Sequence, residues 1–162
     1  TQNVDSLHKK ANHSVDNLIE IHGNIHYKRK IDAESIEELV IADWDAINEN
    51  KVAQEVLSLF NIKPNGDIKD DSYRPHILLF DEYYTELYKY SKALTWILEA
   101  DTILFMGTSN SVGFTAGALQ TSLNKNKKII VVDPNPSPSF IHPKIELHQM
   151  SSTAFCKHYF SL

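Results

Sequence analysis

The sequence predicts an α/β fold built on an open parallel sheet, with a helical insertion in its first half. Short apolar runs alternate with segments of helical periodicity, which is typical of parallel sheets covered by helices. Residues 101–135 show this in one βαβ unit: an apolar run at Thr102–Met106, a turn containing Gly107, a helix of small residues, and a second apolar run at Ile129–Val132. Residues 27–73 are more charged and change to helical spacing, so we expect them to form the insertion.

The length and composition favour a single globular domain with one core. The chain has 162 residues, of which 42% are hydrophobic and 23% are charged. Its net charge of −5 argues against a nucleic-acid partner, and no apolar stretch is long enough to predict a membrane span. Cys156 is the only cysteine, which excludes an internal disulfide and a cysteine-based zinc site in the chain and favours a cytoplasmic location.

The first third of the chain predicts a short helix, a strand and a helical hairpin. Val4–Ala11 is expected to be helical and to end at Asn12, which tolerates a left-handed cap. Leu18–Ile21 predicts a strand, which Gly23 then breaks. The two helices of the hairpin are expected because apolar residues recur at helical spacing. They are Ile36, Leu39, Val40, Ala42, Trp44 and Ile47 in the first helix, and Val52, Val56, Leu57 and Phe60 in the second.

The remaining elements complete the expected sheet. Ile77–Phe80 predicts a brief buried strand, and the crossover helix of the βαβ unit is expected at Ser111–Leu123. Alternating apolar residues at 145–149 predict a last short strand, and 153–162 a closing helix. The helix between the strands at 77–80 and 102–106 has an apolar face made of Tyr84, Leu87, Tyr88, Leu94, Ile97 and Leu98.

Polar and acidic groups follow both strands of the βαβ unit. Gly107, Thr108 and Ser109 form a turn at the carboxyl end of the first strand, where a helix N-terminus makes a pocket for phosphate. Asp133 ends the second strand and is placed to hold a ribose hydroxyl. The full G-x-G-x-x-G fingerprint is absent from this unit, so an ordinary βαβ crossover accounts for it equally well.

Three other segments combine reactive or polar side chains. Asn3 and Asp5 precede a helix, and they either cap its free N–H groups or hydrogen-bond an amide and a ribose. His22 ends a predicted strand, where it is either a structural histidine or a general base at cellular pH; no metal site is predicted around it. Phe80 ends another strand and would line any cleft onto which the sheet opens.

Taken in order, five motifs resemble those of the sirtuin family of NAD-dependent protein deacylases. They are Thr-Gln-Asn-Val-Asp at 1–5, Glu-Ile-His-Gly-Asn at 20–24, Arg-Pro-His-Ile-Leu-Leu-Phe-Asp-Glu at 74–82, Gly-Thr-Ser at 107–109 and Val-Val-Asp at 131–133. The resemblance implies a partial Rossmann-like parallel sheet, formed by residues 1–26 and 74–162 as an incomplete NAD-binding domain. A helical insertion at 27–73 would replace the zinc-binding small domain of the family.

The resemblance also implies a role for each matching residue. The pocket for nicotinamide and its ribose would be bordered by Gln2, Asn3 and Asp5. The catalytic residues would be His22, as the general base, and Asn3. The phosphates, adenosine and ribose hydroxyls of NAD would be held by Gly107, Thr108, Ser109 and Asp133. The acyl-lysine tunnel would be lined by Leu78, Phe80 and Asp81, whose backbone would also pair with a substrate strand.

Three departures from the family pattern bear on these expectations. The resemblance implies NAD as co-substrate. Residues 27–73 contain none of the four zinc-binding cysteines usual in the family, so we expect no zinc. Packing around Trp44 and Phe60 would supply the order that zinc usually gives. Asp81 replaces the usual Gly and adds a charge where a substrate backbone would approach. Asp133 replaces the usual Asn and still accepts from ribose hydroxyls.

The Gly-Ala-Gly-Ile-Ser phosphate loop, which precedes Thr-Gln-Asn in the family, has no counterpart in these 162 residues. We therefore expect this chain alone to be inactive and to bind NAD weakly or not at all, and to be completed by a missing N-terminal segment or another chain. The expected reaction removes acyl groups from protein lysine and releases nicotinamide and O-acyl-ADP-ribose.

Two alternatives stay open: an NAD glycohydrolase in which water attacks, and a non-catalytic half-domain that binds a nucleotide or a partner. Both enzyme hypotheses require His22 and the turn at Thr108 to face a common crevice.

Overall fold

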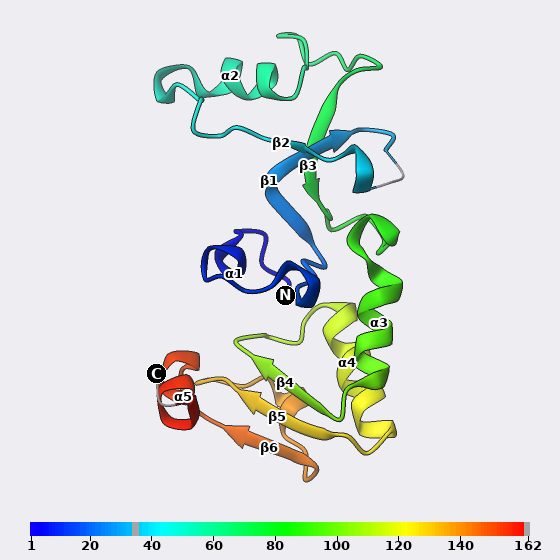
Figure 1. The fold of residues 1–162 in the computed structure, drawn as a ribbon, viewed down its shortest axis with the longest axis vertical. Helices are drawn as coiled ribbons and strands as arrows, with labels where there is room; N and C mark the ends of the chain where they lie inside the picture. Colours follow the sequence, from blue (N-terminus) through cyan, green and yellow to red (C-terminus); the bar gives the residue numbers. More distant parts are fainter. Residues whose placement is uncertain (34–35, 161–162) are drawn as a thin grey trace. The chain divides into compact units, whose positions relative to one another are not determined.

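The computed structural model describes residues 1–33 and 36–160 and divides into two compact units, Thr1–Ala93 and Leu94–Leu162 (Figure 1). Helix α3 (Tyr90–Glu99) spans the division. Each unit contains its own three-stranded sheet, so the single core expected from the length is wrong. The assignment of 1–26 and 74–162 to one domain stays a prediction.

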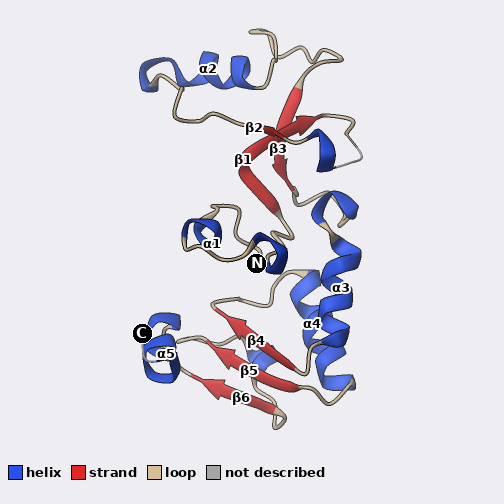
Figure 2. Ribbon diagram, in the orientation of Figure 1, coloured by secondary structure: helices blue, strands red, loops and turns tan. Residues whose placement is uncertain are grey.

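The first unit is built on an antiparallel sheet. Its strands lie in the order β2 (Val40–Ile41), β1 (Gly23–Lys30) and β3 (Tyr73–Ile77), with β1 paired to both neighbours (Figure 2). Its α-helices are α1 (Leu7–Lys10) and α2 (Val52–Leu59). Short 3-10 turns occupy Val15–Asn17, Ile36–Glu38, Glu49–Lys51 and Glu86–Tyr88.

The first helix expected in residues 27–73 does not form. Ile36–Glu38 makes a single 3-10 turn, and Val40–Ile41 becomes the edge strand β2. The indole N–H of Trp44 donates to the carbonyl of Ile25 at 2.7 Å, which ties the following segment to β1. Adjacent β-branched residues favour an extended strand, and β1 offers the backbone partners that a helix would otherwise supply internally. The second expected helix is confirmed as α2.

The strand expected at Leu18–Ile21 is also wrong. The N–H of Gly23 donates to the carbonyl of Glu20 at 2.8 Å, so this segment forms a turn just before β1. Ile19 and Ile21 are nevertheless buried. The alternating apolar pattern therefore indicated correctly that these side chains are buried. A loop that turns them toward the interior buries them as well as a strand would.

The strand expected at Ile77–Phe80 lies earlier, at β3. The pairing with β1 extends back through Arg74 and Pro75, next to a shift in register between Asn24 and Lys28. Irregular pairing of this kind accommodates a proline that lacks a backbone donor. Residues 73–77, which include the polar start of the motif, therefore belong to the sheet, and the apolar residues 78–80 form a loop.

The second unit confirms the predicted βαβ arrangement and the Rossmann-like fold class. Strands β4 (Thr102–Met106), β5 (Lys128–Val132) and β6 (Ile145–His148) are parallel and lie in that order. Helix α4 (Gly113–Asn124) connects β4 to β5, and α5 (Ser152–Phe160) follows β6.

The core of the second unit forms between β5 and α4. Central strand β5 is almost continuously apolar because a central parallel strand is covered on both faces; Ile129, Val131 and Val132 are buried. Helix α4 buries side chains at helical spacing, including Ala118 and Leu119.

Among the residues that the structure describes, no helix has both the length and the apolar character needed to cross a membrane.

Candidate functional site

His22 lies at the start of β1, not at the carboxyl end of a strand as expected. Its carbonyl accepts a hydrogen bond from the N–H of Leu78 at 3.0 Å, which places it beside the end of β3. Gly23, the next residue, has φ +81°, and a Cβ atom there would lie 2.0 Å from the carbonyl oxygen of His76. Only glycine allows the two strands to approach this closely at His22.

The His22 imidazole is held by two different segments. Its Nε2 lies 2.9 Å from the Tyr84 hydroxyl. Burial lowers the pKa of His22, and a hydrogen bond to the Gln2 backbone opposes this with a smaller effect. The lowered pKa keeps the ring neutral at cellular pH, which is the state that a general base requires.

The first residues of the chain run beside His22. The N–H of Ile21 donates to the carbonyl of Thr1 at 3.0 Å, and the N–H of Ile25 donates to that of Val4 at 3.0 Å. These bonds bring Gln2 and Asn3 next to the segment that carries His22.

Asp5 has a structural contact of its own. Its Oδ1 accepts from the N–H of Leu7 at 3.0 Å, so this carboxylate satisfies a free backbone donor at the start of α1. The structure therefore favours the capping role for Asp5, and its role toward a ribose stays a prediction.

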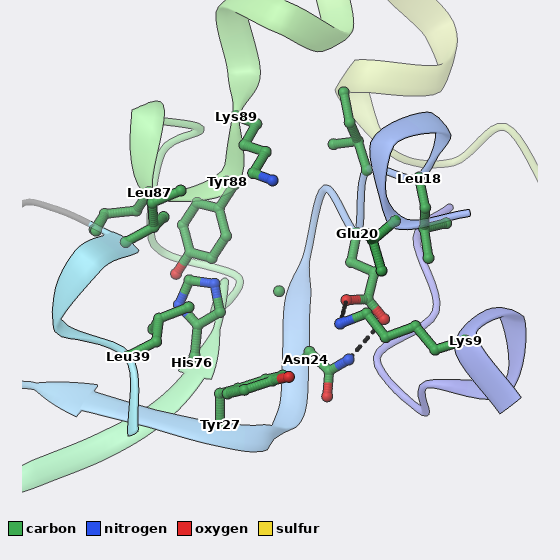
Figure 3. Close-up of a pocket in the computed structure, with 14 residues that line it drawn as sticks. Lys9, Leu18, Glu20, Asn24, Tyr27, Leu39, His76, Leu87, Tyr88 and Lys89 are labelled. Carbon is green, nitrogen blue, oxygen red and sulfur yellow. Dashed lines mark hydrogen bonds and ion pairs between the residues drawn. The ribbon is translucent and has the colours of Figure 1, made fainter. Parts of the chain in front are cut away.

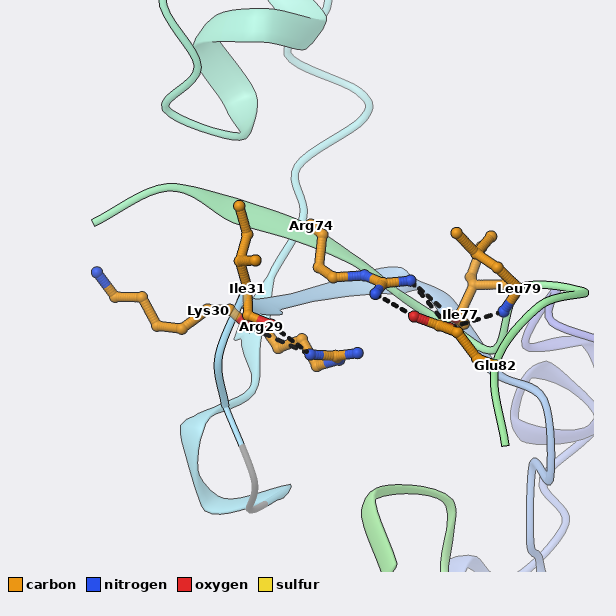
Figure 4. A network of polar contacts seen from close by, with 7 residues as sticks. All are labelled: Arg29, Lys30, Ile31, Arg74, Ile77, Leu79 and Glu82. Carbon is orange, nitrogen blue, oxygen red and sulfur yellow. Dashed lines mark hydrogen bonds and ion pairs between the residues drawn. The ribbon is translucent and has the colours of Figure 1, made fainter. Parts of the chain in front are cut away.

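The three predicted substrate residues lie in a loop that an ion pair fixes to β3 (Figure 4). Arg74 of β3 pairs with both carboxylate oxygens of Glu82. Glu82 in turn accepts from the N–H of Leu79 at 2.9 Å. The turn between them leaves Phe80 and Asp81 exposed. Because its base is fixed, this loop exposes an apolar ring and a carboxylate shortly after Leu78, whose N–H bonds to the His22 carbonyl.

The pH dependence of stability tests this ion pair. The hydrogen bond from Arg74 holds the pKa of Glu82 below its ordinary value, against a smaller opposing effect of burial. The stabilisation is therefore present above the ordinary glutamate pKa and is lost as the pH falls through the lowered one. Glu82→Gln is expected to remove this part of the acid destabilisation in urea titrations at several pH values. Glu49→Gln, at an exposed carboxyl, is the control and should keep the wild-type profile.

In the second unit, Gly107 and Asp133 lie at the same edge of the parallel sheet. Met106 and Val132 are paired at the ends of β4 and β5, and the N–H of Gly107 donates to the carbonyl of Val132 at 3.1 Å. Gly107 has φ +60°, which its lack of a side chain permits. The Asp133 carboxylate accepts from the N–H of Asn135 at 2.8 Å.

The turn that follows Gly107 leads into α4 without a side-chain cap at Val112. The hydroxyls of Ser109 and Ser111 lie 2.6 Å apart within it. Uncapped N–H groups and the helix dipole make such a helix start suitable for an anion. Thr108 and Ser109 lie in the turn between β4 and α4, and their role toward a phosphate stays a prediction. His22 belongs to the first unit and Thr108 to the second, so their common crevice stays a prediction.

Two residues of interest were missed by the sequence patterns. Asn110 has φ 56°, donates to Ser139 at 2.8 Å, and buries an Oδ1 that has no hydrogen-bond partner among the described residues. Tyr84 reaches His22 across 62 positions of sequence. The sequence signal for Asn110 is an Asn directly after Gly-Thr-Ser, since Asn adopts a positive φ more readily than most residues. The contact of Tyr84 depends on how the chain folds.

A cavity of about 280 Å³ lies on the first unit, apart from the predicted site residues (Figure 3). Glu20 links two segments that line the cavity: its carboxylate pairs with Lys9 of α1 at 2.7 Å and accepts from the Asn24 side chain of β1 at 2.6 Å. His76 stacks on Tyr88 with ring centres 5.2 Å apart. Burial, assisted by Arg29, lowers the pKa of His76 to about 4, so this second histidine is neutral and structural.

Within residues 1–33 and 36–160, no cluster of three or more His, Cys, Asp or Glu side chains has the geometry of a metal site.

The sequence and the fold were then compared with known proteins. Residues 1–113 match the model of the Sir2 family. The chain is 35% identical over 138 residues to the NAD-dependent deacetylase sir2E of Dictyostelium discoideum, covering 80% of this chain and 39% of that protein. It is 30% identical over 141 residues to an NAD-dependent protein deacylase of Aggregatibacter actinomycetemcomitans, covering 86% and 56%. The chain thus spans only 39–56% of the length of these two relatives.

The fold is also similar to that of solved Sir2 structures. A solved structure described as a Sir2–p53 peptide–NAD⁺ complex matches with a TM-score of 0.74 and 19% identity, over 99% of this chain and 60% of that one. A second, described as a Sir2 homolog–NAD complex, matches with a TM-score of 0.72 and 21% identity, over 98% and 54%. The family match covers more than half of the chain and includes four of the five motifs in full. The chain therefore belongs to the Sir2 family.

Proposed function

We propose that the whole protein is an NAD-dependent protein lysine deacylase in which His22 is the general base. The observation that carries this proposal is the convergence of three separate segments on one histidine. The Gln2 backbone hydrogen-bonds to the His22 ring, the Tyr84 hydroxyl lies 2.9 Å from its Nε2, and the N–H of Leu78 hydrogen-bonds to its carbonyl. Burial lowers the pKa of the imidazole and keeps it neutral. A base that is neutral, fixed and close to a substrate loop has the properties that proton removal requires.

NAD is proposed as the co-substrate. The acyl oxygen of the substrate lysine would attack the ribose carbon from which nicotinamide leaves, and His22 would then take the proton of a ribose hydroxyl. Nicotinamide would leave in the first step, and water would then add to the acyl carbon as its bond to the lysine nitrogen breaks, releasing free lysine and O-acyl-ADP-ribose. Asn3 would assist at the same ribose, and Gln2 and Asp5 would border the nicotinamide.

The second unit supplies groups that fit the rest of the dinucleotide. The uncapped start of α4 and the hydroxyls of Thr108 and Ser109 suit phosphate oxygens. Asp133 at the end of β5 suits a ribose hydroxyl, and its negative charge disfavours a 2′-phosphate. These features support NAD over its phosphorylated analogue as the co-substrate.

Product analysis tests the proposal directly. The full polypeptide is incubated with NAD, with and without an acetylated lysine peptide, and the products are identified by mass spectrometry. O-acetyl-ADP-ribose that appears only with the peptide is the expected result. ADP-ribose formed equally without the peptide would instead identify a glycohydrolase, an alternative favoured by the charge that Asp81 places at the substrate loop. If NAD stays intact in both mixtures, the proposed activity is wrong and the non-catalytic alternative stands.

The 162-residue chain by itself is expected to bind NAD weakly or not at all. The matched regions cover only 39% and 56% of the two relatives, so we propose that residues outside this chain contribute to the dinucleotide site. Isothermal titration of the chain with NAD should give no saturable heat at micromolar concentrations. Saturable micromolar binding would show that these residues suffice.

Asp81 is expected to influence substrate choice. Its exposed carboxylate stands at the tip of the loop that carries Leu78 and Phe80, where a peptide with Lys or Arg next to the acyl-lysine would gain an opposite charge. Asp81→Gly should reduce the preference for basic over acidic peptides several-fold in kcat/KM, and more strongly at low salt. Asp45→Gly, at another exposed acid, should leave the preference unchanged. An identical preference in the Asp81 variant would contradict this role.

A further inference from the structure

Tyr84 is the side chain in closest polar contact with the His22 imidazole, and none of the five motifs assigns it a role. Its hydroxyl lies 2.9 Å from His22 Nε2. It reaches this position from the loop before the 3-10 turn Glu86–Tyr88, just beyond the ion-paired Glu82. The contact therefore joins the proposed base to the segment that follows the substrate loop.

Ring stacking fixes the Tyr84 hydroxyl in place. The rings of Tyr84 and His22 are stacked with centres 5.8 Å apart and an interplanar angle of 24°. On the α3 side, Tyr84 stacks with Tyr90 at 5.6 Å and 14°. A tyrosine in contact with aromatic rings on both sides loses most of its rotational freedom, so its hydroxyl has a fixed direction relative to the imidazole.

A neutral imidazole has one N–H donor and one lone-pair acceptor. Burial, with a smaller effect of Tyr90, raises the pKa of Tyr84, so its hydroxyl keeps its proton at neutral pH and is able to donate. The His22 ring also hydrogen-bonds to the Gln2 backbone, and this bond raises the pKa of His22, as a donation from the ring does. If the ring donates to Gln2 through Nδ1, its Nε2 carries the lone pair.

We propose that Tyr84 is a positioning residue that holds His22 in the Nδ1–H tautomer by donating its hydroxyl hydrogen bond to Nε2. Free imidazole side chains in water favour the opposite tautomer, in which Nε2 carries the proton and has no lone pair. In serine hydrolases a buried carboxylate sets the histidine tautomer in a comparable way, and the wrong tautomer costs most of the activity. Tyr84 and the Gln2 backbone together would keep the lone pair on Nε2, and the ribose hydroxyl would displace the Tyr84 hydroxyl from Nε2 to pass on its proton.

The consequence for turnover rests on the proposed function, whereas the tautomer itself does not. The tautomer is measured by nitrogen-15 NMR of the histidine rings in the folded chain without NAD. The chain has eight histidines, so the His22 signals are assigned by their loss in His22→Gln. The expected wild-type result is a protonated Nδ1 and an unprotonated Nε2 at neutral pH. A wild-type His22 that is protonated on Nε2 overturns the proposal without any need for a tyrosine variant.

Tyr84→Phe keeps the ring stack and removes only the hydroxyl. Its His22 signals are expected to move toward the Nε2–H tautomer. Tyr83→Phe is the matched control, because Tyr83 is the neighbouring tyrosine and is 87% exposed; its His22 signals should equal those of the wild type. Unchanged His22 signals in a folded Tyr84→Phe would overturn the proposal.

The effect of Tyr84 on turnover is measured with the full polypeptide. Tyr84→Phe is expected to lower kcat for O-acyl-ADP-ribose formation by about tenfold or more with little change in KM for NAD, since the lost hydroxyl affects the base and not the binding of the dinucleotide. A shifted tautomer with unchanged kcat would overturn the role in catalysis. If the wild-type protein has no activity, the proposed function fails, and the NMR result still decides the tautomer.

Discussion

His22→Ala is expected to lower NAD-dependent deacylation by the full polypeptide by about 10²–10⁴-fold, the usual contribution of a positioned general base. The imidazole is neutral because burial lowers its pKa, and it is fixed between the Gln2 backbone and Tyr84. Removing it leaves no other group in this position to accept a ribose proton. Initial rates of O-acyl-ADP-ribose formation measure the effect.

The matched control is His13→Ala, which removes an exposed histidine of the same unit. Its rate should stay within about twofold of the wild type, since an exposed residue away from the site contributes little. The two variants should also have similar melting temperatures. A His22 variant that turns over at the wild-type rate would remove this residue from the mechanism.

Gly23→Ala is expected to be the most destabilising single substitution in the first unit among those discussed. At φ +81° any L side chain costs about 1–2 kcal/mol. The new Cβ would also lie 2.0 Å from the His76 carbonyl oxygen, which forces the backbones of β1 and β3 apart and adds about 1–3 kcal/mol. The free energy of unfolding should therefore fall by about 2–5 kcal/mol, measured by urea denaturation.

Gly66→Ala separates the two contributions. Gly66 has φ +87°, close to that of Gly23, but an added Cβ atom would meet nothing within 4 Å. Only the backbone cost of about 1–2 kcal/mol is therefore expected. Equal losses in the two variants would show that β1 and β3 do not approach as closely as described. Because His22 precedes Gly23, the Gly23 variant should also lose activity at temperatures where it remains folded.

The elements that the sequence predicted well are those whose pattern depends on local chemistry. The runs Thr102–Met106 and Ile129–Val132 became parallel strands within one residue of their expected bounds, with the expected crossover helix between them. Continuous apolar runs bounded by turn residues have few alternatives in an α/β unit. Asn12 likewise takes its expected left-handed conformation, with φ 58°.

The first unit was predicted less well because its structure depends on pairing between distant segments. Ile36–Ile47 has helical spacing, but its backbone groups find partners on β1, and a strand with β-branched residues replaced the helix. His22 was expected at the end of a strand and begins one instead. Local pattern indicates that a residue is buried, whereas the partner that covers it is decided by the rest of the chain.

By itself, the sequence determined the identity of the chemical groups: a histidine before a glycine, a hydroxyl-rich turn after an apolar strand, and an acid after the next. These depend on residue type and short spacing. Only the tertiary structure decided the partners of those groups. It brings Tyr84 within 2.9 Å of His22, joins Arg74 to Glu82, and gives Asp5 a capping role. Hydrogen bonds act over about 3 Å, so contacts between residues many positions apart exist only once the strands and loops that carry them have packed.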